Sequence, residues 1–171
     1  VTLSDEPDKH TYLSCEFSCF HSSPVIGLPA PFADVESTFH TSGSRALSFL
    51  AQLLNILGMT FRERCDMALS WFGPFRHVPH LLVRVMPQRD IEACAALSVT
   101  PKDKDKDKDA RVEVAIHRIY LLFHPCDTLD PALEAKMLTA PCIPVNVKDE
   151  FPIVRDPAKL NVVEWGGVLL N

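Results

Sequence analysis

The sequence lacks the motifs that most directly assign an activity. No Gly-x-Ser-x-Gly, Cys-x-x-Cys or His-Glu-x-x-His pattern occurs in its 171 residues, so the commonest hydrolase, thiol-redox and zinc-peptidase motifs are missing. It also has no Asn-x-Ser/Thr acceptor for glycosylation. The six cysteines are too few for a disulfide-built fold of this length and read as free, buried thiols. We therefore expect an intracellular protein of a reducing compartment, cytoplasmic or nuclear.

Long apolar runs are also missing. A membrane-spanning helix needs roughly 18 to 20 apolar residues in succession, and the most apolar helical stretch, Ala46 to Leu57, is interrupted by three polar residues. The acidic N-terminal stretch, Val1 to His10, has no signal-peptide pattern. Because the sequence has no initiator methionine, we expect a domain of a larger, eukaryotic protein or a processed chain.

An excess of positive charge is absent as well. The net charge is -5, and the 17 Lys and Arg residues are scattered rather than clustered. Binding a phosphate backbone requires clustered cations, so general nucleic-acid binding is not expected. The predicted partners are proteins, with self-association as one form.

What the sequence does contain is material for a core. Hydrophobic residues make up 47% of it, and the clearest pattern is a helix from Ser42 or Ser44 to Leu57 that ends at Gly58. Its apolar positions leave little polar surface, which predicts a central, buried helix. These positions are Leu47, Phe49, Leu50, Leu53, Leu54, Ile56 and Leu57.

A second helix is predicted to follow after a sharp corner at Met59. Thr60 and Glu63 have the spacing of a capping box, and Gly73-Pro74 is expected to end the helix. The apolar face expected to pack inward is Phe61, Cys65, Ala68, Leu69 and Phe72.

Strands are predicted from alternation and from runs of apolar residues. They are Thr11–His21, His80–Met86 and Arg111–Phe123, followed by a C-terminal hairpin over Leu160–Leu170 with its turn at Gly166-Gly167. Further helices are predicted over Gln88–Leu97 and from Asp130. The order predicts an α+β fold in which a mixed, mostly antiparallel sheet packs against a central helix pair; an α/β fold is the alternative.

One low-complexity segment interrupts this pattern. Lys102 to Asp109 consists of four Lys-Asp repeats, which can bury nothing and predict a flexible, solvated loop. We expect residues 1–171 to form a single domain around it.

With no catalytic motif, a non-catalytic protein-protein interaction or scaffold domain is the favoured function. Trp71 and Phe75 fall off the expected inward face of their helix and lie next to Arg76, a combination typical of binding hot spots. Trp165 in the C-terminal segment is a further candidate. The alternative is that loops pack over these rings.

The competing hypothesis is an enzyme with a Cys/His or metal-assisted site at the strand ends. His80, His124 and Cys126 would form it if their strands aligned. Cys15 and His21 lie too far apart on one strand to bind a single ion. No catalytic residue, cofactor or metal ligand is therefore predicted outright.

Overall fold

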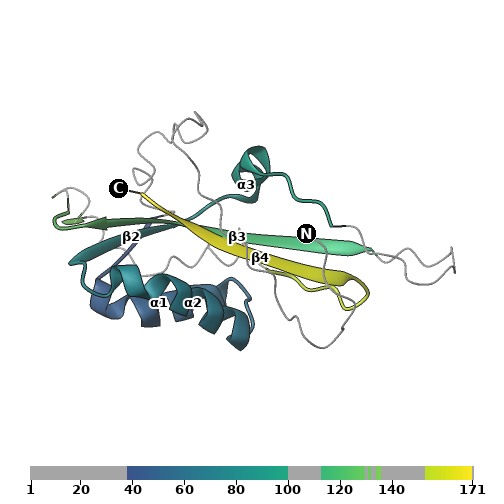
Figure 1. Ribbon diagram of the computed structural model, residues 1–171, viewed down its shortest axis with the longest axis horizontal. Helices are drawn as coiled ribbons and strands as arrows, with labels where there is room; N and C mark the ends of the chain where they lie inside the picture. The colour runs from purple at the N-terminus through teal and green to yellow at the C-terminus, as the bar shows by residue number, and fades with distance from the viewer. Residues whose placement is uncertain (1–37, 100–112, 130, 132–133, 136–152, 171) are drawn as a thin grey trace, which may run out of the picture.

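The computed structural model describes residues 38–99, 113–129, 131, 134–135 and 153–170 (Figure 1). The predicted strand at residues 11–21, the Lys/Asp tract and most of the helix expected from residue 130 lie outside these residues. The described elements, in chain order, are β1 (Thr38–Thr41), a 3-10 turn η2 (Gly43–Arg45), α1 (Ala46–Ile56), α2 (Phe61–Phe75), β2 (His80–Val85), α3 (Gln88–Cys94), β3 (Val114–Cys126) and β4 (Leu160–Leu169).

The strands form one mixed sheet in the order β1-β2-β3-β4. The β1–β2 and β2–β3 pairs are antiparallel, and the β3–β4 pair is parallel. The helices α1 and α2 lie together on one face, whereas α3 lies on the other (Figure 1). This confirms the predicted α+β fold, a mostly antiparallel mixed sheet with a helix pair, over the α/β alternative.

The corner between α1 and α2 has the form that the sequence predicts. Gly58 has a positive φ of 86°, a backbone conformation that glycine adopts at little cost. Its amide donates to the carbonyl of Asn55 at 3.1 Å, and the amide of Met59 donates to that of Leu54 at 3.1 Å. These two bonds are those of a Schellman motif, and they satisfy carbonyls that the helix end would leave unpaired.

The main core lies between the helix pair and the sheet. From α1 it takes Phe49, Leu50, Leu53 and Leu54, and Leu57 follows at the corner. The sheet supplies alternate residues of its strands, as expected for one buried face. These are Phe39, Leu81, Val83, Val85, Ile119, Leu121 and Phe123. Leu82 and Leu122, on the opposite face, are also buried, so β2 and β3 are central strands with both faces covered.

The predicted C-terminal hairpin is wrong. β4 is one continuous strand whose whole length pairs with β3, and Gly166 and Gly167 lie within it opposite Tyr120 and Leu121. Both glycines leave space for aromatic rings. A Cβ atom on Gly166 would lie 2.8 Å from the ring of Tyr120, and one on Gly167 would lie 2.6 Å from that of Phe123. The glycine pair therefore reflects close ring packing rather than a turn.

Two predicted helix ends also change. α2 continues through Pro74 to Phe75, and α3 ends at Cys94 rather than at Leu97. In the last turn of α2 the proline removes one N–H, while the ring of Phe75 becomes fully buried. Burying such a ring contributes about 1.5–3 kcal/mol. This gain offsets the cost of the missing proline N–H and allows the helix to continue to Phe75.

Candidate functional site

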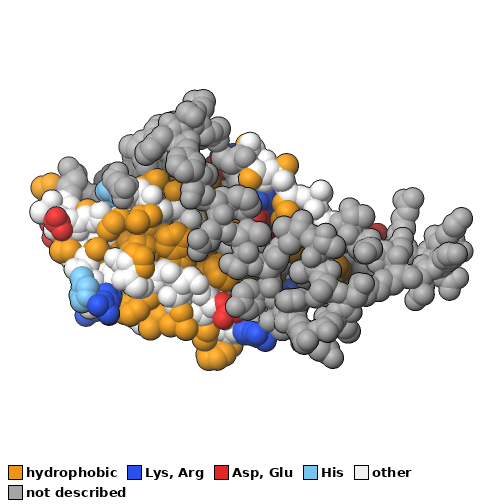
Figure 2. All heavy atoms as spheres, viewed as in Figure 1, with side chains coloured by type: hydrophobic (Ala, Val, Ile, Leu, Met, Phe, Trp, Pro, Cys, Tyr) orange, Lys and Arg blue, Asp and Glu red, His pale blue; other side chains and the backbone are white. Residues whose placement is uncertain are grey.

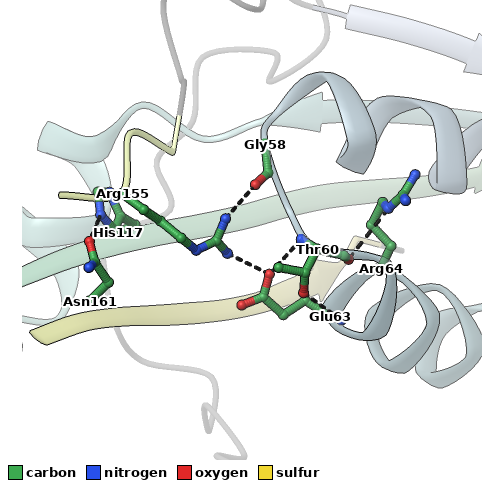
Figure 3. Close-up of polar contacts among 7 residues, drawn as sticks. All are labelled: Gly58, Thr60, Glu63, Arg64, His117, Arg155 and Asn161. Carbon is green, nitrogen blue, oxygen red and sulfur yellow. Dashed lines mark hydrogen bonds and ion pairs between the residues drawn. The ribbon is translucent and has the colours of Figure 1, made fainter. Parts of the chain in front are cut away.

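The first turn of α2 is fixed by a capping box and by an ion pair from a distant segment. The amide of Thr60 donates to the Glu63 carboxylate at 2.7 Å, and the Glu63 amide donates to Thr60 Oγ1 at 3.4 Å. Arg155 reaches the same carboxylate at 2.6 Å and the carbonyl of Gly58 at 2.8 Å (Figure 3). The segment before β4 is thereby attached to the helix corner, and α2 is held in one orientation.

The charge of Glu63 is stabilised in this arrangement. Burial by itself would raise the pKa of its carboxyl, but the hydrogen bonds from Thr60 and the pairing with Arg155 outweigh it and hold the pKa below the ordinary value. The carboxylate is therefore ionised at neutral pH and is occupied within the fold, rather than being available to a ligand.

The inward face of α2 differs from the predicted one. The residues of α2 that are buried are Met67, Ala68 and Phe75. The rings of Trp71 and Phe75 both contact that of Phe123 on β3, each with centroids 4.8 Å apart. The predicted stripe is right for Ala68, which is buried, and for Phe72, which packs against the core. It is wrong for Phe61 and Leu69, whose side chains are 75% and 65% exposed. The large rings at 71 and 75 reach the sheet, and α2 is rotated about its axis accordingly.

This rotation leaves an apolar stripe on the surface. We define the outer face of α2 as Phe61, Cys65, Leu69 and Arg76, which lie within about one third of the helix circumference at about 100° per residue. Phe61 and Leu69 are the two most exposed large hydrophobic side chains of the described helices. Hydrophobic side chains gather along the lower edge of Figure 2, over the helix layer. Arg64 lies over the Phe61 ring at 5.8 Å.

The four residues predicted for an interaction surface occupy different environments. Phe75 is fully buried and is removed from any surface. Trp71 and Trp165 are partly buried and pack against the core. Arg76 is exposed at the end of α2, where its Nε donates to His77 Nε2 at 2.7 Å. Trp71 and Phe75 were candidates for the surface because the predicted stripe of α2 did not include them, and the alternative that these rings are covered describes Phe75.

The strand-end residues of the enzyme hypothesis do come together. The β2–β3 register places His80 opposite Cys126 and Leu82 opposite His124, so His80, His124 and Cys126 share the face of the sheet away from the helix pair. His80 Nδ1 lies 3.0 Å from His40 Nε2 on β1, and His124 Nδ1 lies 3.2 Å from the carbonyl of Leu170. The contact with His40 was not foreseen, because nothing in the sequence shows that β1 pairs with β2.

The Cys126 thiol is not activated by this surrounding. Burial, and then the negative charge of Asp127, raise its pKa. A nucleophilic cysteine needs the opposite shift, since the thiolate is the reactive form. In the part of the chain that the structure describes, no three or more His, Cys, Asp or Glu side chains group in a way that could hold a metal ion.

A buried polar network on the same face was also missed. Arg118, with a side chain only 3% exposed, pairs with Glu164 of β4 and donates to the carbonyl of Ala95 after α3. Tyr120 donates to the same carboxylate at 2.9 Å. The sequence feature that could have revealed this network is Arg118 itself, an arginine inside an apolar strand, with Tyr120 two residues away on the same face. Arg118, Tyr120 and Glu164 all bond within the fold, so the network links β3 to β4 and to the segment after α3.

Two further observations bear on the class of protein. None of the helices that the structure describes is both long enough and apolar enough to cross a membrane. Comparison of the chain with protein-family models, with curated proteins and with solved structures gives no match to any of them.

Proposed function

We propose that the chain is a non-catalytic interaction domain that binds a partner protein through the outer face of α2. The observation that carries the proposal is the exposure of Phe61 and Leu69, 75% and 65%, on one face of a helix whose other face is fixed in the core. Single exposed apolar residues are ordinary on protein surfaces. Two large ones aligned along a helix, with Cys65 between them, form the apolar centre that protein interfaces typically have.

The charges around this face indicate the kind of partner. The whole chain carries a net charge of -5, but residues 60–76 contain three arginines against two carboxylates. One of these carboxylates, on Glu63, is paired with Arg155. The helix that carries the outer face is thus slightly basic in an acidic protein, and Arg76 lies within the face itself. It suits a partner whose apolar side chains are surrounded by Asp and Glu, because complementary charge at the rim favours encounter and orientation.

Affinity capture followed by measured binding tests the proposal. Partners captured from cell extract by the wild-type chain would be identified, purified and titrated against it by calorimetry. The double variant Phe61→Ser/Leu69→Ser should bind at least tenfold more weakly, since it removes the apolar centre and leaves the core intact. Binding of the wild-type chain should also weaken as salt is added, because the rim charges are exposed.

The matched control carries the same two serine substitutions at exposed leucines elsewhere. Leu160 and Leu169 are 44% and 42% exposed at the two ends of β4, and Leu160→Ser/Leu169→Ser should bind within about twofold of wild type. Equal loss in both double variants, or no captured protein that depends on Phe61 and Leu69, contradicts the proposal. Sedimentation velocity tests whether the partner is a second copy of this chain. A dimer that is abolished only by the α2 variant would assign the outer face to self-association.

The reactivity of Cys126 toward alkylation tests the enzyme alternative. Because burial and Asp127 raise the pKa of this thiol, little thiolate exists near pH 7, and alkylation should be slower than for a small-molecule thiol. Iodoacetamide labelling at pH 7, followed by peptide mass mapping, measures the rate at Cys126 separately from the other cysteines. Labelling faster than the free thiol would favour a nucleophile at the His80–Cys126 position.

A further inference from the structure

The face of the sheet away from the helix pair carries a close pair of imidazoles. His40 lies on the edge strand β1 and His80 at the start of β2. In the register His40 is opposite Leu82, so the two histidines are diagonal neighbours on one face. Nε2 of His40 lies 3.0 Å from Nδ1 of His80, and the ring planes are inclined by 32°. Both residues are partly exposed, so ions from solvent can reach them.

The two facing nitrogens share a single proton. At 3.0 Å one nitrogen donates and the other accepts through its lone pair, so at least one ring is neutral on this side. A neutral imidazole is the form that binds metal ions. The carboxylate of Glu134 is close enough to interact electrostatically with His40, and it favours an incoming cation.

The spacing of the two nitrogens matches that of adjacent ligands on a metal ion. With metal–nitrogen bonds of about 2.0–2.1 Å, two nitrogens at 90° lie about 2.9 Å apart and two at a tetrahedral angle about 3.3 Å apart. The observed 3.0 Å is nearest to the first arrangement, which is that of square-planar or tetragonal Cu²⁺ and Ni²⁺. Before two lone pairs could face one ion, the donating nitrogen would have to lose its proton, to the other nitrogen of its ring or to solvent, and both rings would have to turn.

We propose that His40 and His80 form a two-imidazole binding site for a divalent late transition-metal ion, with Cu²⁺ bound more tightly than Ni²⁺ or Zn²⁺. Water would complete the coordination, which is consistent with the described residues forming no cluster of three or more ligands. The order of affinities follows from imidazole ligands and the general stability sequence of these ions. The site is independent of the outer face of α2, which lies on the other side of the sheet.

Metal binding would also connect two strands. β1 is four residues long and lies at the edge of the described sheet. An ion held by one histidine from β1 and one from β2 would join the edge strand to a central strand. Because the unfolded chain does not hold the two rings together, binding should stabilise the folded state. A rise in melting temperature with Cu²⁺ or Ni²⁺ is the expected consequence.

The test uses the full chain with any histidine purification tag removed. CuCl₂ and NiCl₂ would be titrated by calorimetry in a weakly coordinating buffer, with electron paramagnetic resonance of the Cu²⁺ sample to detect nitrogen ligands. Wild type should bind one ion. His40→Gln and His80→Gln should each weaken binding at least tenfold and abolish the rise in melting temperature. His77→Gln, at an exposed histidine three residues before His80, should bind within about twofold of wild type.

Backbone amide signals of the wild-type chain provide a readout that does not depend on any variant folding. A substoichiometric amount of Cu²⁺ should broaden the signals of residues 40 and 80 before those of His77 and His117. Failure of wild type to bind, equal weakening by His77→Gln, or broadening centred on other residues would each overturn the proposal.

Discussion

Gly167 shows how single side chains direct the path of the chain. It lies inside β4, where a Cβ atom would be 2.6 Å from the ring of Phe123 and 2.8 Å from that of Trp71. These two rings are themselves in contact, with centroids 4.8 Å apart. Glycine is required here because aromatic rings from α2 and β3 occupy the space that a side chain would need.

Substituting Gly167 by alanine should therefore destabilise the protein. We expect Gly167→Ala to lower the free energy of unfolding by about 1–3 kcal/mol, the usual cost of inserting a methyl group into a packed core. Gly73 is the matched control, because it lies in α2 and, apart from its chain neighbours and its own helix backbone, nothing lies within 4 Å of its would-be Cβ. Gly73→Ala should change the free energy of unfolding by less than about 1 kcal/mol, because the higher helix propensity of alanine is opposed by the restriction that Pro74 places on the residue before it. Urea unfolding measures both, and equal effects at the two sites would contradict the packing argument.

At the scale of elements, the corner between α1 and α2 is the most locally determined part of the fold. Its stop signal at Gly58 and its start signal at Thr60 are separated by Met59 alone. The tertiary structure then adds Arg155, which bonds both the carbonyl of Gly58 and the carboxylate of Glu63. The hydrogen bonds of the corner join residues close together in the sequence, whereas its attachment to the segment before β4 needs the complete fold.

The pairing of Glu63 with Arg155 should make stability depend on pH. Because the folded-state pKa of Glu63 lies below its ordinary value of 4.5, its contribution is fully present above that pH and is lost as the pH falls through the folded value. Glu63→Gln should therefore be less stable than wild type by about 0.2–1 kcal/mol at pH 7. This difference should shrink between pH 5 and about pH 3.

Urea unfolding at pH 7, 5 and 3 measures this difference, and Arg155→Gln serves as the second arm of a double-mutant cycle. In the Arg155→Gln background the pH dependence of the Glu63→Gln effect should be reduced. A difference that grows on acidification would show that the ionised carboxylate does not stabilise the fold.

At the scale of the whole molecule, α1 is the element around which the main core is built. Leu53, Leu54 and Leu57 have no exposed surface, and the helix packs beside α2 on one face of the sheet (Figure 1). Leu54→Ala should lower the free energy of unfolding by about 2–5 kcal/mol, because the transfer free energy is lost and a cavity remains. Leu69→Ala, at a 65% exposed position, should change it by less than about 0.5 kcal/mol. Chemical denaturation monitored by circular dichroism compares the two, and a loss below 0.5 kcal/mol at Leu54 would contradict its central position.

Local signals were sufficient for much of this fold. The capping residue Thr60 and the stop at Gly58 act through hydrogen bonds within a few residues of each other, so the sequence predicts them directly. The strand at residues 80–85 and the central strand β3 follow from their apolar composition. The apolar richness of α1 predicts its burial for the same reason, since a helix with so little polar surface must be enclosed.

The tertiary structure decided what depends on distant residues. The inward face of α2 was set by contact of Trp71 and Phe75 with a ring on β3, which outweighed the regular spacing of Phe61 and Leu69. Gly166-Gly167 resembles a turn in the sequence because a glycine pair is locally the same whether it bends or makes room for a ring. The two imidazoles of His40 and His80 meet only because β1 pairs with β2 in one register. Periodicity and capping are properties of neighbouring residues, whereas helix rotation, strand partners and site composition depend on contacts that the linear sequence does not specify.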